Sequence, residues 1–310
     1  MAELQFTASA ALSVDQIETL KKVMNGVVDL HLHLAPDVMT RINDDMEFLD
    51  AASKVGYKGV ILKDHYSMTT ERSYFMRKLY KGIGTYGSLA LNNSVGGLNA
   101  DAVEVALQRD AREIWMPTFD SAYQIEQFKR LSNPPPPPKK TKEVKRTGLR
   151  KSGLSILSGD GQIRPELSDI LGMISDADVI LGSGHLSSEE TYALVGAARK
   201  VGVRKILITH PETPPSVFDA GSQKKFVEMG AMMEHSIPLV SDPTTVRGIA
   251  ANIRSVGADK CILSSDAGAI IKGHPVVAFR NFIEGLAKEG IKESDVWLMT
   301  RTNPSKLLGI

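Results

Sequence analysis

The sequence has a single cysteine, Cys261, among its 310 residues. One cysteine cannot form an internal disulfide bond, which excludes the class of small disulfide-rich domains. Because Cys261 lies in the apolar run KCILSSD, we expect it to be a buried small hydrophobic residue. The scarcity of cysteine fits a reducing compartment such as the cytoplasm.

Long hydrophobic runs and an excess of charge of one sign are also absent. No segment approaches the ~20 apolar residues of a membrane-spanning helix, and the first 20 residues lack the basic start and apolar centre of a secretory signal. The net charge of +1 indicates neither a nucleic-acid partner nor a membrane surface. We therefore expect a cytoplasmic protein that acts on a small molecule, with homo-oligomer formation left open.

The sequence does contain a repeated alternation of short apolar runs and helix-like segments. Eight runs have strand length: VVDLH from Val27, GVILK from Gly59, GSLALN from Gly87, EIWMP from Glu113, DVILGS from Asp178, KILIT from Lys205, AMMEH from Ala231 and CILSS from Cys261. Most are continuously hydrophobic, as expected for parallel strands covered on both faces. Eight such units predict a single-domain (β/α)₈ TIM barrel over residues 1–310.

Helix-start signals support this division of the chain. Ser187 and Glu190 have capping-box spacing, and Asn43 and Asn99 precede segments with helical periodicity. A further helix within residues 13–26 precedes the first strand. We expect it to close the bottom of the barrel or to pack on its flank, in a structural role.

One segment, residues 133–151, breaks the alternation after the fourth strand. It contains five consecutive prolines at 134–138 and seven basic residues within 139–151. Prolines favour an extended conformation, and the basic stretch has little apolar surface to bury. We expect an exposed insertion loop near the barrel mouth, where its charge favours an anionic substrate.

The strongest local motif is the pair His31 and His33 at the end of the first strand. Side chains two apart on a strand share a face, so both imidazoles can bind one ion at ~2.0–2.1 Å. His185, His210 and Asp266 end the fifth, sixth and eighth strands. Because active sites of this architecture lie at the C-terminal strand ends, these five residues predict a divalent-metal site.

These residues resemble the pattern of the amidohydrolase superfamily of metal-dependent enzymes, in an uncharacterised branch. The similarity comprises the D-x-H-x-H motif from Asp29, the histidines His185 and His210, the SSDAG aspartate and the closing NPSKLLGI. The resemblance implies that His31, His33 and Asp266 bind metal, and that the two later histidines are ligands or catalytic groups. Binuclear members bridge two metals through a lysine or glutamate after strand four, where this sequence has EIWMPTFDSA, so one ion is favoured over two.

Other polar residues lie near the same strand ends. Lys63 and His65 follow the second strand. Their candidate functional roles are a substrate-binding cation, an extra metal ligand or a carbamylated lysine. The structural alternative is that Lys63 extends to solvent and His65 bonds to the backbone. Arg41, in the loop after the first strand, is a further candidate for substrate binding. His235 ends the seventh strand beside Glu234, either as a substrate-binding residue or as half of a hydrogen-bonded pair in the wall.

The expected chemistry is activation of water. Zn²⁺ lowers the pKa of bound water from 15.7 to about 7, and Mn²⁺, Fe²⁺, Co²⁺ or Ni²⁺ also suit imidazole and carboxylate ligands. Asp266 would move the proton, His210 would polarise the substrate or complete the coordination, and Lys63 would assist. The leading function is hydrolysis of a small amide, cyclic amide, ester or lactone that carries an anionic group. The alternatives are non-oxidative decarboxylation, phosphoester hydrolysis and a non-catalytic metal-binding protein.

Overall fold

The computed structural model describes residues 13–130, 153–238 and 243–310, so the insertion predicted at 133–151 lies outside the described residues. Within them, eight parallel strands form one sheet in sequence order. Their bounds are β1 Val28–His33, β2 Gly59–Lys63, β3 Gly84–Ala90, β4 Ala111–Trp115, β5 Ile180–Gly182, β6 Ile206–Thr209, β7 Met232–Ser236 and β8 Cys261–Ser264. Each predicted run overlaps one of these strands, which confirms the (β/α)₈ barrel.

The sheet closes on itself through the segment that follows β8. Leu32 and Ala267 form a parallel bridge, His33 N donates to the Ala267 carbonyl at 2.9 Å, and Asp266 N donates to the His31 carbonyl at 2.8 Å. The closure therefore places the backbone of Asp266 directly against that of the two β1 histidines.

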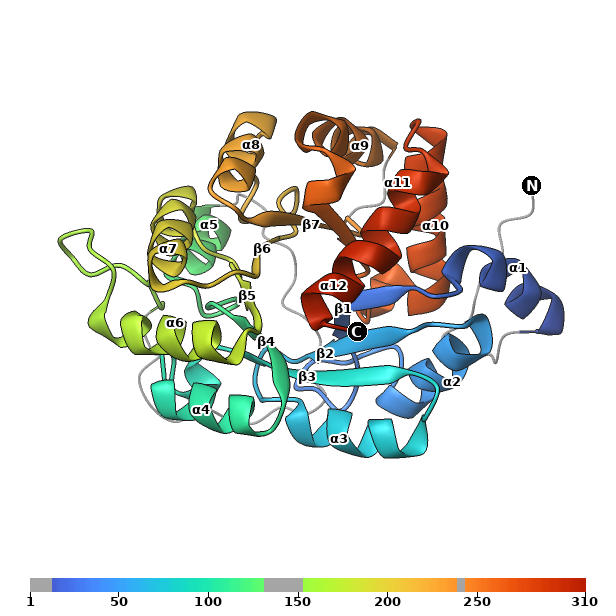
Figure 1. Ribbon diagram of the computed structural model, residues 1–310, viewed down its shortest axis with the longest axis horizontal. Helices are drawn as coiled ribbons and strands as arrows, with labels where there is room; N and C mark the ends of the chain where they lie inside the picture. Colours follow the sequence, from blue (N-terminus) through green and yellow to red (C-terminus); the bar gives the residue numbers. More distant parts are fainter. Residues whose placement is uncertain (1–12, 131–152, 239–242) are drawn as a thin grey trace.

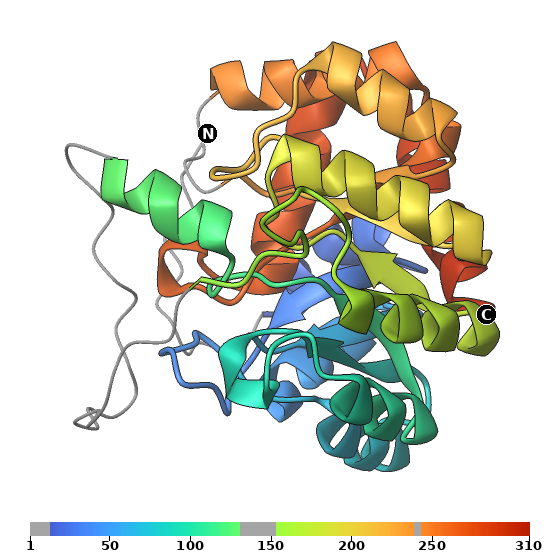
Figure 2. The same cartoon turned by 90° about the vertical axis from the view of Figure 1, so that its left-hand side faces the viewer.

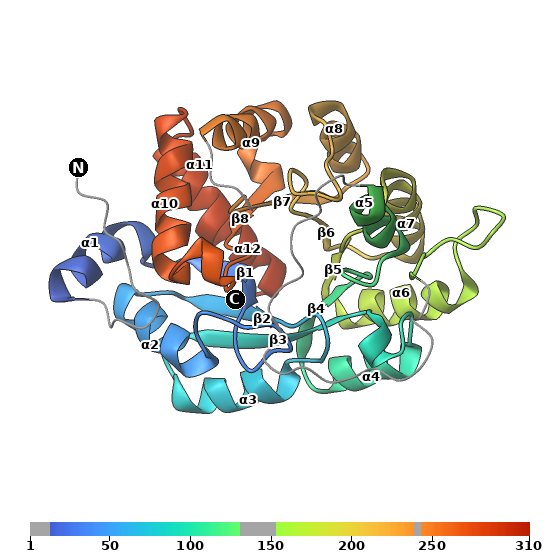
Figure 3. The same cartoon turned by 180° about the vertical axis from the view of Figure 1, so that it is seen from behind.

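Helices surround the strands, as Figures 1 and 3 show from opposite sides. Those that follow strands β1 to β8 in turn are α2 Asp45–Val55, α3 Thr70–Leu79, α4 Ala100–Gln108, α5 Ala122–Arg130 with α6 Pro165–Ala177, α7 Ser188–Val201, α8 Ala220–Glu228, α9 Pro243–Val256 and α10 Pro275–Lys288. Among the helices of the described residues, none is long and apolar enough to cross a membrane.

The predicted helix starts are confirmed at two positions and displaced by one residue at a third. Ser187 and Glu190 form the capping box of α7, and Asn99 caps α4. The cap of α2 is Asp44 rather than Asn43, because Asp44 stands three residues before Glu47 and forms a reciprocal capping box with it.

The bottom of the barrel is covered by the C-terminal helix. The chain ends with α11 Glu293–Trp297, a π-helical turn Leu298–Thr302 and α12 Asn303–Leu308. Leu307 and Leu308 of α12 join the inner core cluster that contains Val28 and Leu30 of β1. The first helix, α1 Val14–Met24, contacts α2 and α10 instead, so of the two expected positions it takes the flank.

One helix, α5, stands apart from the outer ring. Figure 2 shows it on the side of the barrel opposite the C-terminus, the side at which the strands end. Ser121, just before α5, donates its hydroxyl to the His185 carbonyl at 2.8 Å. The loop after β4 is thereby tied to the loop after β5 at the barrel mouth.

Candidate metal centre

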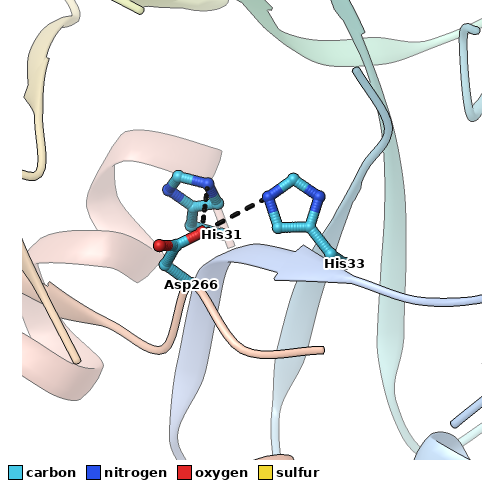
Figure 4. Close-up of side chains that lie close together, drawn as sticks. All are labelled: His31, His33 and Asp266. Carbon is cyan, nitrogen blue, oxygen red and sulfur yellow. Dashed lines mark ion pairs between the residues drawn. The ribbon is translucent and has the colours of Figure 1, made fainter. Parts of the chain in front are cut away.

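Three side chains from two strand ends converge at the mouth (Figure 4). His31 and His33 of β1 are buried, and an irregularity between Asp29 and Leu32 adjusts the register of this strand against β2. His31 Nε2 lies 3.1 Å and His33 Nε2 3.3 Å from Asp266 Oδ1. One carboxylate oxygen thus faces both imidazole nitrogens.

The position of Asp266 depends on its backbone and on a lysine. Its φ of 42° lies in the left-handed region, which costs energy for a non-glycine residue and commonly marks a functional position. Lys272 donates to Asp266 Oδ2 at 3.0 Å and to its carbonyl oxygen at 2.7 Å. Burial raises the pKa of Asp266, but neighbouring groups, led by the ammonium of Lys272, lower it more, so its pKa lies well below the usual range.

Hydrogen bonding sets the tautomer of His31. Its Nδ1 lies 3.1 Å from Glu234 Oε1, which also accepts the Ser264 hydroxyl at 2.8 Å. A carboxylate can only accept, so the imidazole donates from Nδ1 and presents the Nε2 lone pair to the mouth. In metal sites, the second ring nitrogen of a ligating histidine commonly donates to a carboxylate, which fixes the orientation of the ring.

The group fits a divalent ion by its chemistry and spacing. One ligand atom from each of His31, His33 and Asp266 lies within 4.8 Å of the others. His31 Nε2 lies 3.1 Å from a carboxylate oxygen of Asp266, so the two atoms are close enough to bind one cation together. Burial, with the nearby Arg41 charge, lowers the pKa of His33 well below its ordinary value, so this imidazole is neutral and can bind metal.

The other two predicted ligands form a neighbouring pair. His185 Nε2 and His210 Nε2 are 3.1 Å apart, and the His210 ring stacks on His31 with centroids 5.8 Å apart. Gln124 Oε1 accepts from His185 Nδ1, which leaves its Nε2 free to accept or to bind. Burial lowers the pKa of His210 to about 4 and that of His185 well below its usual range. Metal binding or catalysis by His185 and His210 remains a prediction.

Lys63 and His65 both belong to the buried mouth. Lys63 is 1% exposed and donates from Nζ to His31 Nε2 at 2.9 Å, so it does not extend to solvent. Burial lowers its pKa. His65 stacks on His33 with ring centroids 4.6 Å apart, and its ring is tilted against that of Phe119 at 4.1 Å. Its Nδ1 bonds the Thr118 hydroxyl at 2.9 Å rather than the backbone.

Arg41 and His235 differ in where they lie. Arg41 is held by Asp37 at 2.6 Å, and its charge contributes to the lowered pKa values of His33 and His65, so it lies near the mouth. His235 does not lie near the mouth, because side chains alternate along a strand and His235 points to the face of β7 opposite that of Glu234. There its Nδ1 bonds Glu212 at 3.0 Å beneath α8 and α9. The structure thus corrects the expectation that His235 lines the substrate site.

The sequence places Glu234 with His235 at the end of the seventh strand, and of the two it is Glu234 that contacts His31. Sequence reasoning missed three further residues around the centre. Glu113 is a charged residue inside an apolar strand, two residues before Trp115, which also signals an inward-facing group. Gln124 and Lys272 lie in loop-proximal segments with no periodic pattern, and only the folded backbone brings them to His185 and Asp266.

Several solved structures share this fold. An amidohydrolase from Pseudomonas aeruginosa is 12% identical with a TM-score of 0.60, covering 94% of this chain and 98% of its own. A 2,6-dihydroxybenzoate decarboxylase from Rhizobium is 13% identical (TM-score 0.53; 92% and 99% covered). A dihydroxybenzoic acid decarboxylase from a Polaromonas species, with bound manganese and an inhibitor, is 11% identical with a TM-score of 0.55. The match covers 92% of this chain and 97% of that enzyme. These likenesses show the fold, and they confirm the barrel that the amidohydrolase resemblance implies.

Comparison of sequences gives a narrower assignment. No curated protein matches the chain. A family described as a family of unknown function, DUF6282, matches residues 26–234. That range runs from the start of β1 to β7 and includes His31, His33, His185 and His210, but not Asp266. Because the match spans well over half of the sequence, the chain belongs to this family.

Proposed function

We propose that this chain is a metal-dependent hydrolase that cleaves a small-molecule amide, cyclic amide, ester or lactone. One observation carries the proposal: His31 Nε2, His33 Nε2 and Asp266 Oδ1 converge at the C-terminal ends of the barrel strands. A similar solved structure is an amidohydrolase, and another contains manganese, which supports a divalent ion in this chain.

The residues of the chain divide the chemical work among them. His31, His33 and Asp266 would hold a divalent ion, which would supply Lewis-acid chemistry that makes water a better nucleophile. Asp266 stays ionised beside Lys272, so it can accept the proton of the attacking water and deliver it to the leaving group. His210 is neutral, and its Nε2 lies at the mouth beside His185, where it can bind the substrate oxygen or complete the ligand set.

An anionic group on the substrate would meet positive charge at this mouth. The positive charge of Arg41 acts on His33 and His65. The rings of His65 and Phe119, in tilted contact, add an aromatic wall. These features favour a planar substrate with a carboxylate. The two decarboxylases of similar fold are named for dihydroxybenzoate or dihydroxybenzoic acid, which are of this kind.

Non-oxidative decarboxylation is the second candidate, because such carboxylates are also what those two enzymes act on by name. A single screen separates the two reactions. Purified protein, loaded with Zn²⁺ or Mn²⁺, is assayed for ring opening of carboxylated lactones and cyclic amides and for release of CO₂ from aromatic carboxylates. Ring opening that requires metal supports the hydrolase, whereas CO₂ release alone would replace it with the decarboxylase. Turnover in neither arm, with metal bound, would contradict both.

A further inference from the structure

The interior of the barrel contains a carboxylate without hydrogen bonds. Glu113 of β4 is fully buried, and neither of its oxygens accepts a hydrogen bond from a described residue. A Cβ at Gly182 would lie 2.9 Å from Glu113 Oε1 and closer still to Trp115, so a glycine on β5 leaves room for both side chains. Burying a carboxyl group without any hydrogen bond is costly, and such a group is expected to have a partner in another state of the protein.

A lysine lies on the same side of the barrel. Lys63 Nζ is 4.5 Å from the centre of the Trp115 ring, and Glu113 shares the inward face of β4 with Trp115 because the two are two residues apart. Burial raises the pKa of Glu113 well above its usual range, Glu234 raises it further, and Lys63 opposes both. The ammonium of Lys63 is therefore within electrostatic reach of Glu113.

Lys63 donates to the atom that a metal would use. Its Nζ lies 2.9 Å from His31 Nε2, the nitrogen whose lone pair faces the mouth once Nδ1 donates to Glu234. One lone pair cannot serve an ammonium and a metal ion together, and two positive charges at such a distance repel each other. Binding of an ion at His31 therefore requires the ammonium to leave.

We propose that Lys63 is a two-position lysine, which competes with a divalent ion for His31 Nε2 and moves to Glu113 when the ion binds. The inference rests on the proposed metal site. The four-carbon stem of lysine allows such a movement. Among the residues that the structure describes, Glu113 is the buried carboxylate with neither oxygen hydrogen-bonded, so it can receive the ammonium. Glu113 is then a positioning residue for Lys63.

The test is a double-mutant cycle on metal affinity, measured by titrating Mn²⁺ into the full chain against a competing chelator. Lys63→Met removes the competitor and should tighten Mn²⁺ binding about tenfold, or about 1.4 kcal/mol. Glu113→Gln removes the receiving carboxylate and should weaken binding about tenfold. In the Lys63→Met background the Glu113→Gln change should have almost no effect, because no ammonium remains to be moved.

Two results would overturn the proposal. Weaker binding in Lys63→Met would mean that the lysine supports the ion, and an equal Glu113→Gln effect in both backgrounds would mean that Glu113 only attracts the ion through space. Lys205→Met is the matched control, since Lys205 is a partly buried lysine that bonds Asp178 near the start of β6, and it should leave affinity unchanged.

A second measurement does not depend on the variants folding. In a crystal structure of the Mn²⁺-loaded wild-type chain, Lys63 Nζ should lie within hydrogen-bond distance of Glu113 rather than of His31. An ammonium still on His31 Nε2, or an amine that coordinates the ion, overturns the proposal. Failure of the wild-type chain to bind Mn²⁺ or Zn²⁺ would remove the proposed function as well, whereas normal binding with Lys63 unmoved removes this inference alone.

Discussion

Two buried histidine–glutamate pairs lie on opposite faces of the same strand, β7. On the inner face, His31 Nδ1 is 3.1 Å from Glu234 Oε1, and on the outer face His235 Nδ1 is 3.0 Å from Glu212 Oε2. The outer glutamate also accepts hydrogen bonds from side-chain amides of α8 and α9 through Oε1. The inner glutamate leaves Oε2 without a hydrogen bond from any described residue.

The comparison teaches that the pair itself does not make a functional centre. What differs is the second nitrogen of each histidine. His31 Nε2 meets Lys63 at 2.9 Å and Asp266 at 3.1 Å at the C-terminal end of the strands, whereas His235 Nε2 has no hydrogen-bond partner among the described residues. The same contact therefore orients a proposed metal ligand on one face and packs within the wall on the other.

The largest expected effect comes from the residue at the centre of the inner group. Asp266→Asn keeps the size of the side chain but removes its capacity to take a proton. Loss of one general acid–base group costs about 10²–10⁴-fold in rate, so kcat on any substrate found by the screen should fall by that factor. Near wild-type turnover in this variant would remove Asp266 from proton transfer.

The next largest effect should come from the outer pair, Glu212 and His235. Its loss should lower stability without changing metal binding. Glu212→Gln leaves the buried His235 without its counter-charge, and breaking a buried pair in this way costs about 3–5 kcal/mol of unfolding free energy. Urea unfolding measures the loss, and metal content in the folded variant should match the wild type. Unchanged stability together with lost metal would invert the roles assigned to the two pairs.

Substitution of the inner glutamate, Glu234, should have a smaller effect, and it should lower metal affinity rather than stability. Glu234→Gln weakens the support behind His31, and loss of such an outer partner typically lowers metal affinity about 10–100-fold. Competition with a chelator gives the ratio of dissociation constants. Glu212→Gln serves as the control of the same chemistry on the other face, and equal losses of affinity in both variants would contradict the comparison.

A final expected effect, which changes neither turnover nor metal affinity, is a dependence of stability on pH. Burial lowers the pKa of His235, but Glu212 outweighs it and raises that pKa from 6.5 to about 10. Because the folded pKa is the higher one, the pair contributes its full stability below pH 6.5 and loses it as the pH rises toward about 10. The unfolding free energy of wild type should therefore decline relative to His235→Gln across this window. Parallel profiles would mean that His235 is neutral.

The sequence was sufficient for the barrel and for the inner histidines. Hydrophobic runs of strand length reflect burial on both faces, so all eight strands could be placed, and His31 and His33 share a face by strand alternation alone. Asp266 could be assigned by its place after the last strand. Its alignment with β1, however, depends on the bridge between Leu32 and Ala267 that closes the barrel.

The remaining features depend on contacts between distant segments. Alternation along β7 could have separated Glu234 from His235, yet the sequence does not say which of the two faces inward. Gln124 and Lys272 reach the mouth from α5 and from the loop after β8, where no periodicity indicates direction. The exposure of Lys63 was equally open, because a lysine at a strand end is as consistent with solvent as with the interior.

The central claim is that the inner face of the barrel mouth binds a metal and the outer face of β7 does not. Elemental analysis of the purified chain, of His31→Ala with His33→Ala, and of His235→Gln tests it directly. We expect about one divalent ion per wild-type chain, the same in His235→Gln, and roughly none in the double variant. A double variant that keeps the wild-type metal content would contradict the account.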